Sequence, residues 1–300
     1  MIRHGNVIKS DSGRHIRVDS LIKAGGQGEA YRATDLDTGQ LGVLKVFYDR
    51  FDRADTLKRL HFLVDQQLDK ACPVLRGPTE LINRNGTVGH YAPHAPGQSL
   101  EEFLSNPSST FVENLLLAIS VTHAVSVLHQ RQIAHGDLHA DNFLVNKIGA
   151  VPQLYAIDLD NFNTPGVPTP GCVGHNLYIA PELRQALAVG KPAIPDICTD
   201  RFALGVLLHE ILLFKHVAAG ADTDEATFQK AMCSGIWLQD PARIDHLSGI
   251  VGGYPVEVLN TDLARLFRQS MSLNGRERPS ADQWETALCQ AIDKVYLCPT

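Results

Sequence analysis

The sequence predicts an α+β protein in two parts, a small antiparallel sheet with one helix over residues 1–95 and a larger, mainly helical part over 96–300. Two observations predict this division. Apolar and polar residues alternate in short segments of the first part, whereas the apolar residues of the second part follow helical spacing. Between the parts, Pro93, Pro96 and Gly97 interrupt both patterns and are typical of a linker.

The alternating segments of the first part are expected to be strands, because turn residues separate them. They lie at 6–9, 15–20, 29–33, 42–47, 78–83 and 87–92. Two of the separating sequences, Asp11-Ser12-Gly13 and Asp37-Thr38-Gly39, are typical of hairpin turns. Residues 54–68 differ, since their leucines fall on one helical stripe, and they predict the helix of this part.

The second part is expected to consist of helices. Ser99 precedes an acidic turn and is a typical N-cap, so a helix should begin there. Further helices are expected at 110–131, 202–214, 260–271 and 280–296, and residues 202–214 are apolar on nearly all sides, as in a core helix. The expected core-facing positions of 110–131 are Leu115, Leu116, Ile119, His123, Val127 and Leu128.

Composition bounds the function classes. A hydrophobic content of 44% over 300 residues is ample for two cores, and a net charge of −6 argues against a general nucleic-acid binder. Residues 1–6 lack the apolar core of a signal peptide, and no apolar run reaches the roughly 18 residues of a membrane span. We therefore expect a cytoplasmic protein that binds neither nucleic acid nor membrane.

The segment 135–142 reads His-Gly-Asp-Leu-His-Ala-Asp-Asn, and Asp158 follows sixteen residues later. An aspartate, an asparagine five residues on and a second aspartate are typical of phosphoryl transfer. That reaction needs oxygen ligands for Mg²⁺, a carboxylate that orients the attacking hydroxyl and a cation on the phosphates. Asn142 and Asp158 are therefore the predicted Mg²⁺ ligands, and Asp137 is the predicted catalytic carboxylate.

Two other interpretations of this segment stay open. It could be a loop of solvated polar residues, or its alternating side chains could bind a metal from one strand face. The residues of that alternative metal cluster are His135, Asp137, His139 and Asp141. Outside such a cluster, His135 is expected to be a buried histidine that hydrogen-bonds the backbone near Asp158.

Residues 21–31 are rich in glycine, and a strand-like segment with Lys45 inside it follows. Glycine lets the backbone approach phosphate oxygens closely. A lysine in such a strand is costly to bury unless an anion meets it. A dinucleotide-binding fold also uses a glycine-rich loop, but it requires a helix after the loop, and residues 29–33 continue as a strand.

Taken in order, these motifs resemble those of the protein kinase family. Further marks are Ile179-Ala180-Pro181-Glu182, an apolar helix that starts near Asp200, and Arg278, which the resemblance pairs with Glu182. The resemblance covers residues 15–295 and is to a divergent, bacterial-looking serine/threonine kinase. It implies a two-lobe kinase fold with ATP and Mg²⁺ in the cleft between the lobes.

The resemblance also implies roles for the first part. Lys45 would contact the α- and β-phosphates and be held by a helix carboxylate. The implied nucleotide-binding residues are Gly25, Gly26, Gln27, Gly28, Ala30, Lys45, Tyr91 and Ala92, the last two in the linker at 90–95. The family carries a glutamate on the helix. Here Asp65 is the expected catalytic partner of Lys45, and Gln66 or Gln67 could be neutral partners only.

Four further residues depart from the family pattern. Asp160 replaces a flexible glycine and is expected to cap a turn, contact a metal or stiffen the loop. Gly136 replaces the arginine that holds a phosphorylated loop, so built-in active geometry or control by a regulatory protein partner is expected. His139 and His175 replace a lysine and a threonine typical of serine/threonine kinases, which leaves the acceptor residue open.

The predicted function is therefore that of an ATP-dependent protein kinase that transfers a phosphoryl group from Mg-ATP to a serine or threonine hydroxyl of a protein substrate. One alternative is a nucleotide-binding pseudokinase that acts as an interaction module. A second is a small-molecule kinase, because antibiotic and sugar kinases share His-Gly-Asp-Leu-His. The peptide-binding marks at 180–182, Asp200 and Arg278 argue against the second alternative.

Overall fold

A computed structural model describes residues 2–84, 86–105, 109–147, 151–219, 223–242 and 254–295. The chain divides into two compact units. The first unit comprises Met1–Pro96, Tyr155–Asp160 and Pro165–Pro170. The second comprises Gly97–Leu154, Asn161–Thr164 and Gly171–Thr300. Two short segments from the second half of the chain thus belong to the first unit, which a single boundary at residue 95 does not capture.

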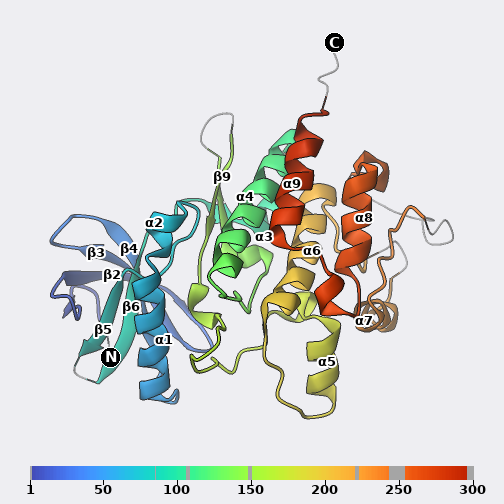
Figure 1. Ribbon diagram of the computed structural model, residues 1–300. Helices are drawn as coiled ribbons and strands as arrows, with labels where there is room; N and C mark the ends of the chain where they lie inside the picture. Colours follow the sequence, from blue (N-terminus) through green and yellow to red (C-terminus); the bar gives the residue numbers. More distant parts are fainter. Residues whose placement is uncertain are drawn as a thin grey trace. The chain divides into compact units, whose positions relative to one another are not determined.

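The first unit is built on a six-stranded antiparallel sheet in the order β1-β2-β3-β4-β6-β5 (Figure 1). Its strands are β1 (Val7–Lys9), β2 (His15–Ala24), β3 (Gly28–Asp35), β4 (Leu41–Phe47), β5 (Glu80–Arg84) and β6 (Thr87–Pro93). All six predicted strands are confirmed. β2 runs four residues further than expected, to Ala24, because it continues to pair with β3 up to the glycine-rich turn.

One long helix packs on this sheet. α1 (Arg53–Gln66) starts after Asp52, whose carboxylate accepts a hydrogen bond from the Asp55 N–H, and it contacts β5 and β6 (Figure 1). It ends at Gln67, which adopts a left-handed φ of 47°. A short helix α2 (Leu68–Ala71) follows, so the expected single helix is divided in two.

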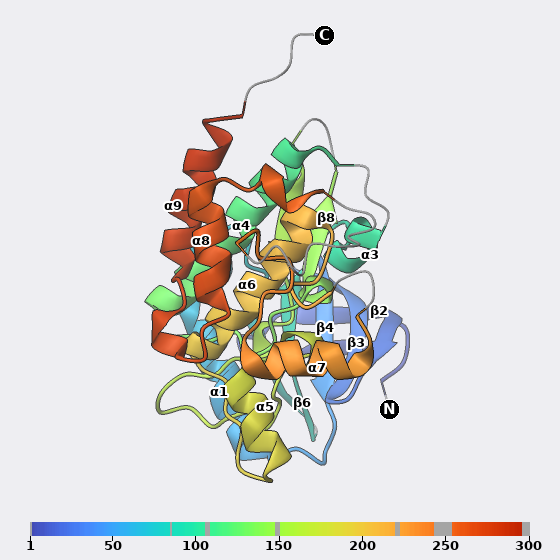
Figure 2. The same cartoon turned by 90° about the vertical axis from the view of Figure 1, so that its right-hand side faces the viewer.

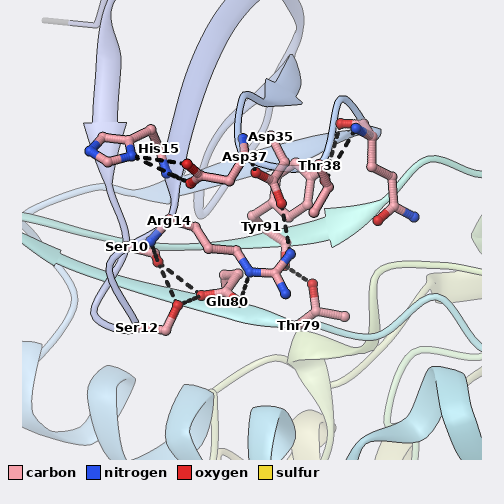
Figure 3. Close-up of polar contacts among 11 residues, drawn as sticks. Ser10, Ser12, Arg14, His15, Asp35, Asp37, Thr38, Thr79, Glu80 and Tyr91 are labelled. Carbon is pink, nitrogen blue, oxygen red and sulfur yellow. Dashed lines mark hydrogen bonds and ion pairs between the residues drawn. The ribbon is translucent and has the colours of Figure 1, made fainter.

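A polar network links the turn between β1 and β2 to the end of β3 and the start of β5 (Figure 3). Arg14 forms ion pairs with Asp35 at 2.7 Å and with Glu80 at 3.1 Å. Glu80 also accepts hydrogen bonds from the hydroxyls of Ser10 and Ser12. Asp35 and Glu80 are both buried, and each buried carboxylate is paired with a cation and hydrogen-bonded, which is what makes such burial tolerable.

We expect Asp35→Asn to lower the free energy of unfolding by about 1–2 kcal/mol at neutral pH, the loss of a charge-assisted hydrogen bond to a half-exposed arginine. Burial acts to raise the pKa of Asp35, but hydrogen bonds from Arg14 and Thr38 outweigh it and lower that pKa. The contribution is thus present above the unfolded pKa of about 3.9 and is lost as the pH falls through the folded value. Urea unfolding at pH 7 and below pH 4 checks this, with exposed Asp65→Asn as control. A difference between wild type and Asp35→Asn that persists at low pH would contradict it.

The second unit is mainly helical, and Figure 2 shows α8 and α9 side by side. They are α3 (Leu100–Ser105), α4 (Phe111–Gln130), α5 (Pro181–Ala188), α6 (Ile197–Leu213), α7 (Glu225–Ser234), α8 (Thr261–Ser270) and α9 (Ala281–Ile292). A small sheet has the order β7-β8-β9, formed by β7 (Gln98–Ser99), β8 (Phe143–Asn146) and β9 (Gln153–Ala156). Single 3₁₀ turns are η1 (Ala140–Asn142), η2 (Leu159–Asn161), η3 (Asn176–Tyr178), η5 (Val256–Val258) and η6 (Gly275–Glu277).

The core of this unit forms around α4 and α6, which pack on each other, with α9 on α4 and α8 on α6 (Figure 2). α6 begins five residues earlier than expected, because Asp196 and Thr199 form a capping box before it. α5 and α7 were not predicted. Both are short, with eight residues in α5 and ten in α7.

α4 is buried on most sides, and the expected stripe is partly wrong. Leu115 and Leu128 are buried as expected, but His123 is exposed, and Leu117 and Val121 are buried instead. Among the described residues, α4 is the helix long and apolar enough to cross a membrane by length and composition, and 61% of its most apolar window is buried inside the protein. That burial is typical of a core helix, whose apolar side chains meet helices on several sides.

Candidate functional site

Lys45 lies on β4 and forms ion pairs with two carboxylates of the same unit. Its Nζ atom is 2.6 Å from Asp158 Oδ1 and 2.8 Å from Asp160 Oδ2. Burial acts to lower the pKa of Lys45, but the charges of Asp160 and Asp158 outweigh it and raise that pKa above its ordinary value. Lys45 is therefore a cation. When both carboxylates are ionised, their two negative charges exceed its single positive charge by one.

The two carboxylates differ in exposure and in the direction of their pKa shifts. The Asp160 side chain is 2% exposed and that of Asp158 is 37% exposed. Burial and the charge of Asp160 raise the pKa of Asp158. Burial acts to raise the pKa of Asp160 too, but the charge of Lys45 outweighs it and lowers that pKa. Asp160 is thus the buried, ionised partner of Lys45, while Asp158 remains accessible to solvent.

Asp65 is not brought to Lys45. It lies on the exposed face of α1, and Lys45 takes Asp158 and Asp160 as its partners instead. Gln67, one of the neutral alternatives, accepts a hydrogen bond from Lys70. The helix therefore does not supply the carboxylate that the resemblance implied for Lys45, and the expected Lys45–Asp65 pair is wrong. The physical reason is the helical phase of α1, which turns residue 65 toward solvent.

The predicted glycine-rich loop is a tight turn between β2 and β3. The Gly25 N–H donates a hydrogen bond to the Gly28 carbonyl at 2.8 Å, and the Gln27 carbonyl accepts one from the Tyr48 N–H. A Cβ atom at Gly28 would lie 2.0 Å from the Val46 carbonyl, so only glycine fits there, whereas a Cβ at Gly26 would meet open space. A side chain at position 26 would thus meet no neighbour, while the Gly26 carbonyl accepts a hydrogen bond from the Arg50 guanidinium.

The other three expected nucleotide-binding residues lie in strands. Ala30 pairs with Lys45 across β3 and β4, and Ala92 pairs with Val43 across β6 and β4. Tyr91 is buried in the sheet core, its carbonyl accepts a hydrogen bond from the Thr79 N–H, and its hydroxyl donates one to the Gln40 carbonyl. The carbonyl and hydroxyl of Tyr91 are thus engaged within the first unit, and its contact with a nucleotide stays a prediction.

Asp137 lies in the loop between α4 and β8, and two side chains of the second unit contact its carboxylate. Asn161 donates a hydrogen bond from Nδ2 to Asp137 Oδ2 at 3.0 Å, and His139 Nε2 is 3.7 Å from Oδ1. Asn142 donates from Nδ2 to the Asp137 carbonyl at 2.9 Å, which leaves its Oδ1 as the acceptor atom of the amide. Asn161 was not predicted, although an asparagine three residues after Asp158 was a visible signal.

Asp200, in the first turn of α6, fixes the backbone of this loop. Its carboxylate accepts hydrogen bonds from the backbone N–H groups of His135 at 2.6 Å and Gly136 at 3.0 Å, and it lies 3.1 Å from His129 Nε2. The His135 ring is buried as expected, but its two nitrogens have no hydrogen-bond partner in the described part of the chain. The loop is therefore fixed by its backbone and not by the His135 ring.

Gly136 has a φ of +75°, and a Cβ atom there would lie 2.7 Å from the Asn161 carbonyl. We expect Gly136→Ala to lower the free energy of unfolding by about 2–4 kcal/mol, from left-handed strain plus the overlap with Asn161. Gly190→Ala is the matched control, since Gly190 has a φ of +67° and open space around it, and it should lose about 1–2 kcal/mol. Urea unfolding measures both. Equal losses would show that the Asn161 carbonyl gives way freely.

A pocket of the second unit adjoins Asp137 and is also lined by His175 and Tyr178. The rings of His139 and His175 stack with centroids 4.9 Å apart. Tyr178 donates a hydrogen bond to Glu210 Oε2 at 2.5 Å, and burial raises the pKa of Glu210 to about 8. The stacked rings of His139 and His175, which replace the family lysine and threonine, therefore form one aromatic surface beside the Asp137 carboxylate.

The alternative metal cluster finds no geometric support. Across the described residues, no group of three or more His, Cys, Asp or Glu side chains is arranged to hold a metal ion. Asp141 is exposed, whereas His135 is buried, so the alternating residues do not share one face. The 3₁₀ turn η1 breaks the strand pattern on which that interpretation depended.

The expected pair of Glu182 and Arg278 is confirmed within the second unit. Arg278 donates from Nη1 to Glu182 Oε1 and from Nη2 to Oε2, both at 2.7 Å. Its guanidinium also donates to the carbonyls of Cys198 and Ser272, each at 2.9 Å. The arginine side chain is fully buried, so this fork-to-fork pair fixes the start of α5 against the segment before α9.

Comparison with known proteins agrees with these motifs. Residues 16–287 match the protein kinase domain. A probable serine/threonine-protein kinase of Corynebacterium glutamicum is 25% identical over 288 residues, which cover 92% of this chain and 41% of that protein. A probable serine/threonine-protein kinase of Corynebacterium efficiens is 26% identical over 289 residues, covering 92% and 40%.

A serine/threonine-protein kinase of Protochlamydia amoebophila is 26% identical over 285 residues, which cover 82% of this chain and 28% of that protein. The chain thus spans about two fifths of the first two relatives and less of the third. The matched region contains Lys45, Asp137, Asn142 and Asp158, as well as Gly136 and Asp160, where the chain departs from the family pattern.

Proposed function

The chain belongs to the protein kinase family, and from this membership we propose that it transfers the γ-phosphoryl group of ATP to a serine or threonine hydroxyl of a protein. The observation that carries the proposal is the fixed Asp137 carboxylate, which Asn161 orients within a loop held by Asp200. A carboxylate so placed can align an acceptor hydroxyl and take up its proton. The pocket beside it, lined also by His175 and Tyr178, is the proposed position of that acceptor.

Residues of the first unit are the proposed binding site of the nucleotide. Lys45 is the proposed contact of the α- and β-phosphates, because it is a fixed cation on a strand. The backbone of Gly25, Gly26, Gln27 and Gly28 can approach the phosphates, since the tip of the turn carries little side-chain bulk. Ala30 and Ala92 are the proposed contacts of the base.

Asn142 and Asp158 are the proposed Mg²⁺ ligands. The residues fit this role, because Asn142 Oδ1 accepts no hydrogen bond from the described part of the chain and Asp158 offers a carboxylate that is 37% exposed. The excess negative charge around Lys45 also suits a cation. When bound, Mg²⁺ would neutralise charge on the phosphates. The chain itself supplies the orientation of the hydroxyl at Asp137 and the hold on the phosphates at Lys45.

One observation favours the pseudokinase alternative: Lys45 is not paired with the helix carboxylate that the family uses. The pair of Lys45 with Asp160 offsets that loss and favours an active enzyme. The small-molecule alternative is less supported, because the Glu182–Arg278 pair that accompanies a peptide-binding unit is formed. A cytoplasmic setting and control by a protein partner remain part of the proposal.

The test combines two measurements on the full chain. Thermal unfolding with and without Mg-ATP reports binding, because a ligand of the folded state raises the midpoint. Transfer of labelled phosphate to peptide pools that contain serine, threonine or tyrosine reports turnover and the acceptor. We expect a raised midpoint and labelling of serine or threonine peptides. A raised midpoint without transfer would favour the pseudokinase, and no shift at all would overturn the proposal.

A further inference from the structure

Arg59 lies on the buried side of α1 and reaches both ends of the segment 160–168, Asp160 and Pro168, which belong to the same unit as α1. It is 6% exposed, which is rare for an arginine and requires that its donors be satisfied. Nη2 donates a hydrogen bond to the Asp160 carbonyl, and Nη1 donates one to the Pro168 carbonyl at 3.0 Å. One side chain of α1 therefore anchors two points of this segment that are eight residues apart.

Asp160 is held from both ends. Arg59 binds its carbonyl, and Lys45 binds its carboxylate, at 3.0 Å from Oδ1 and 2.8 Å from Oδ2. His90 faces the same carboxylate at 4.0 Å, but burial lowers the pKa of His90 to about 3, so it stays neutral there. Lys45 is thus the cation that compensates Asp160.

Asp158, the other carboxylate that pairs with Lys45, has a second role in the proposed function. Asp158 is the proposed Mg²⁺ ligand, and a carboxylate that binds a metal ion has less charge to offer a lysine. Asp160 is almost fully buried and points to Lys45, not to solvent. It is therefore the carboxylate that can hold Lys45 while nucleotide and metal are bound.

We propose that Asp160 and Arg59 are positioning residues for Lys45. Asp160 takes the place of the missing carboxylate of α1, and Arg59 fixes Asp160 to that helix, so α1 controls Lys45 through the segment 158–168. The anchors on Arg59 are backbone carbonyls, so this coupling needs no phosphate on the segment. The proposal rests on the proposed function in assigning the phosphates of ATP as the target of Lys45 and Mg²⁺ as the ligand of Asp158.

The test measures affinities for ATP and for adenosine in the full chain carrying Asp160→Asn or Arg59→Met. Adenosine lacks the phosphates that Lys45 would contact, so a loss of positioning should affect ATP alone. We expect Asp160→Asn to weaken ATP binding and kcat/KM for ATP by about tenfold to a hundredfold, with adenosine binding unchanged. Arg59→Met should act in the same direction. The double variant should lose less than the product of the two factors, because both residues act through Lys45.

Asp65→Asn is the matched control, because it removes the same charge from the exposed face of α1, and it should leave both affinities unchanged. Equal losses for ATP and adenosine, or no loss of ATP binding in either variant, would overturn the inference. If Asp160→Asn fails to fold, Arg59→Met alone decides, since it keeps the carboxylate. A wild-type chain that binds ATP without transferring phosphate would remove the proposed function and leave this binding test intact.

Discussion

Replacing Asp137 by asparagine is expected to slow phosphoryl transfer by a factor of about 10²–10⁴ and to leave ATP affinity nearly unchanged. The amide cannot take up the proton of the acceptor hydroxyl. It can still fill the space beside Asn161, whose Nδ2 lies 3.0 Å from Asp137 Oδ2, so the loop should keep its shape. Single-turnover transfer of labelled phosphate measures the chemical step, and titration with ATP measures binding.

Asp141→Asn is the control for this substitution, because it removes an exposed carboxylate from the same loop. It should retain wild-type transfer. Equal transfer by wild type and Asp137→Asn would exclude Asp137 as the catalytic carboxylate. A parallel loss in Asp141→Asn would show instead that the loop responds to charge in general.

Glu182→Ala is expected to cost about 3 kcal/mol in the free energy of unfolding, near the lower end for a broken buried ion pair. The guanidinium of Arg278 is fully buried and cannot lose its proton, so it would keep an uncompensated charge. The Glu182 side chain is 39% exposed, so water can partly replace it, which is why the lower end is expected. Urea denaturation at neutral pH provides the measurement.

The double variant Glu182→Ala/Arg278→Met tests the cause. If the loss in Glu182→Ala comes from the isolated charge of Arg278, the double variant should lose less than the sum of the two single variants. Additive losses would mean that the pair contributes no coupling. Glu257→Ala, at an exposed position of the same unit, should change stability by no more than about 0.5 kcal/mol.

The α+β architecture and the strands were predictable because their signals are local. Alternation, turn residues and the cap at Ser99 each act within a few residues, and the structure contains the expected strands and the helix α3 that follows Ser99. The buried face of α4 was not predictable in the same way. Its side chains are apolar almost all round, so spacing alone could not separate exposed His123 from buried Val121.

In the candidate site, too, local motifs were predictable and contacts between distant parts of the sequence were not. Lys45, Asp137, Asn142 and Asp158 were visible as motifs, and Arg278 with Glu182 followed from the family resemblance. The carboxylate partner of Lys45 was not predictable. The choice between Asp65 and Asp160 depends on the helical phase of α1 and on a contact between Lys45 and a residue 115 positions away in sequence. Arg59 gave a signal of its own, a charged residue among the buried leucines of α1.

The close approach of Gly136 to the Asn161 carbonyl also constrains how this sequence can evolve. An arginine at position 136 would bring a Cβ atom into that carbonyl and disturb the asparagine that orients Asp137. With the backbone as it is folded, a phosphate-binding arginine at position 136 requires that Asn161 move first. The two changes would have to occur together, so control through an arginine at this position is incompatible with the present shape of the loop.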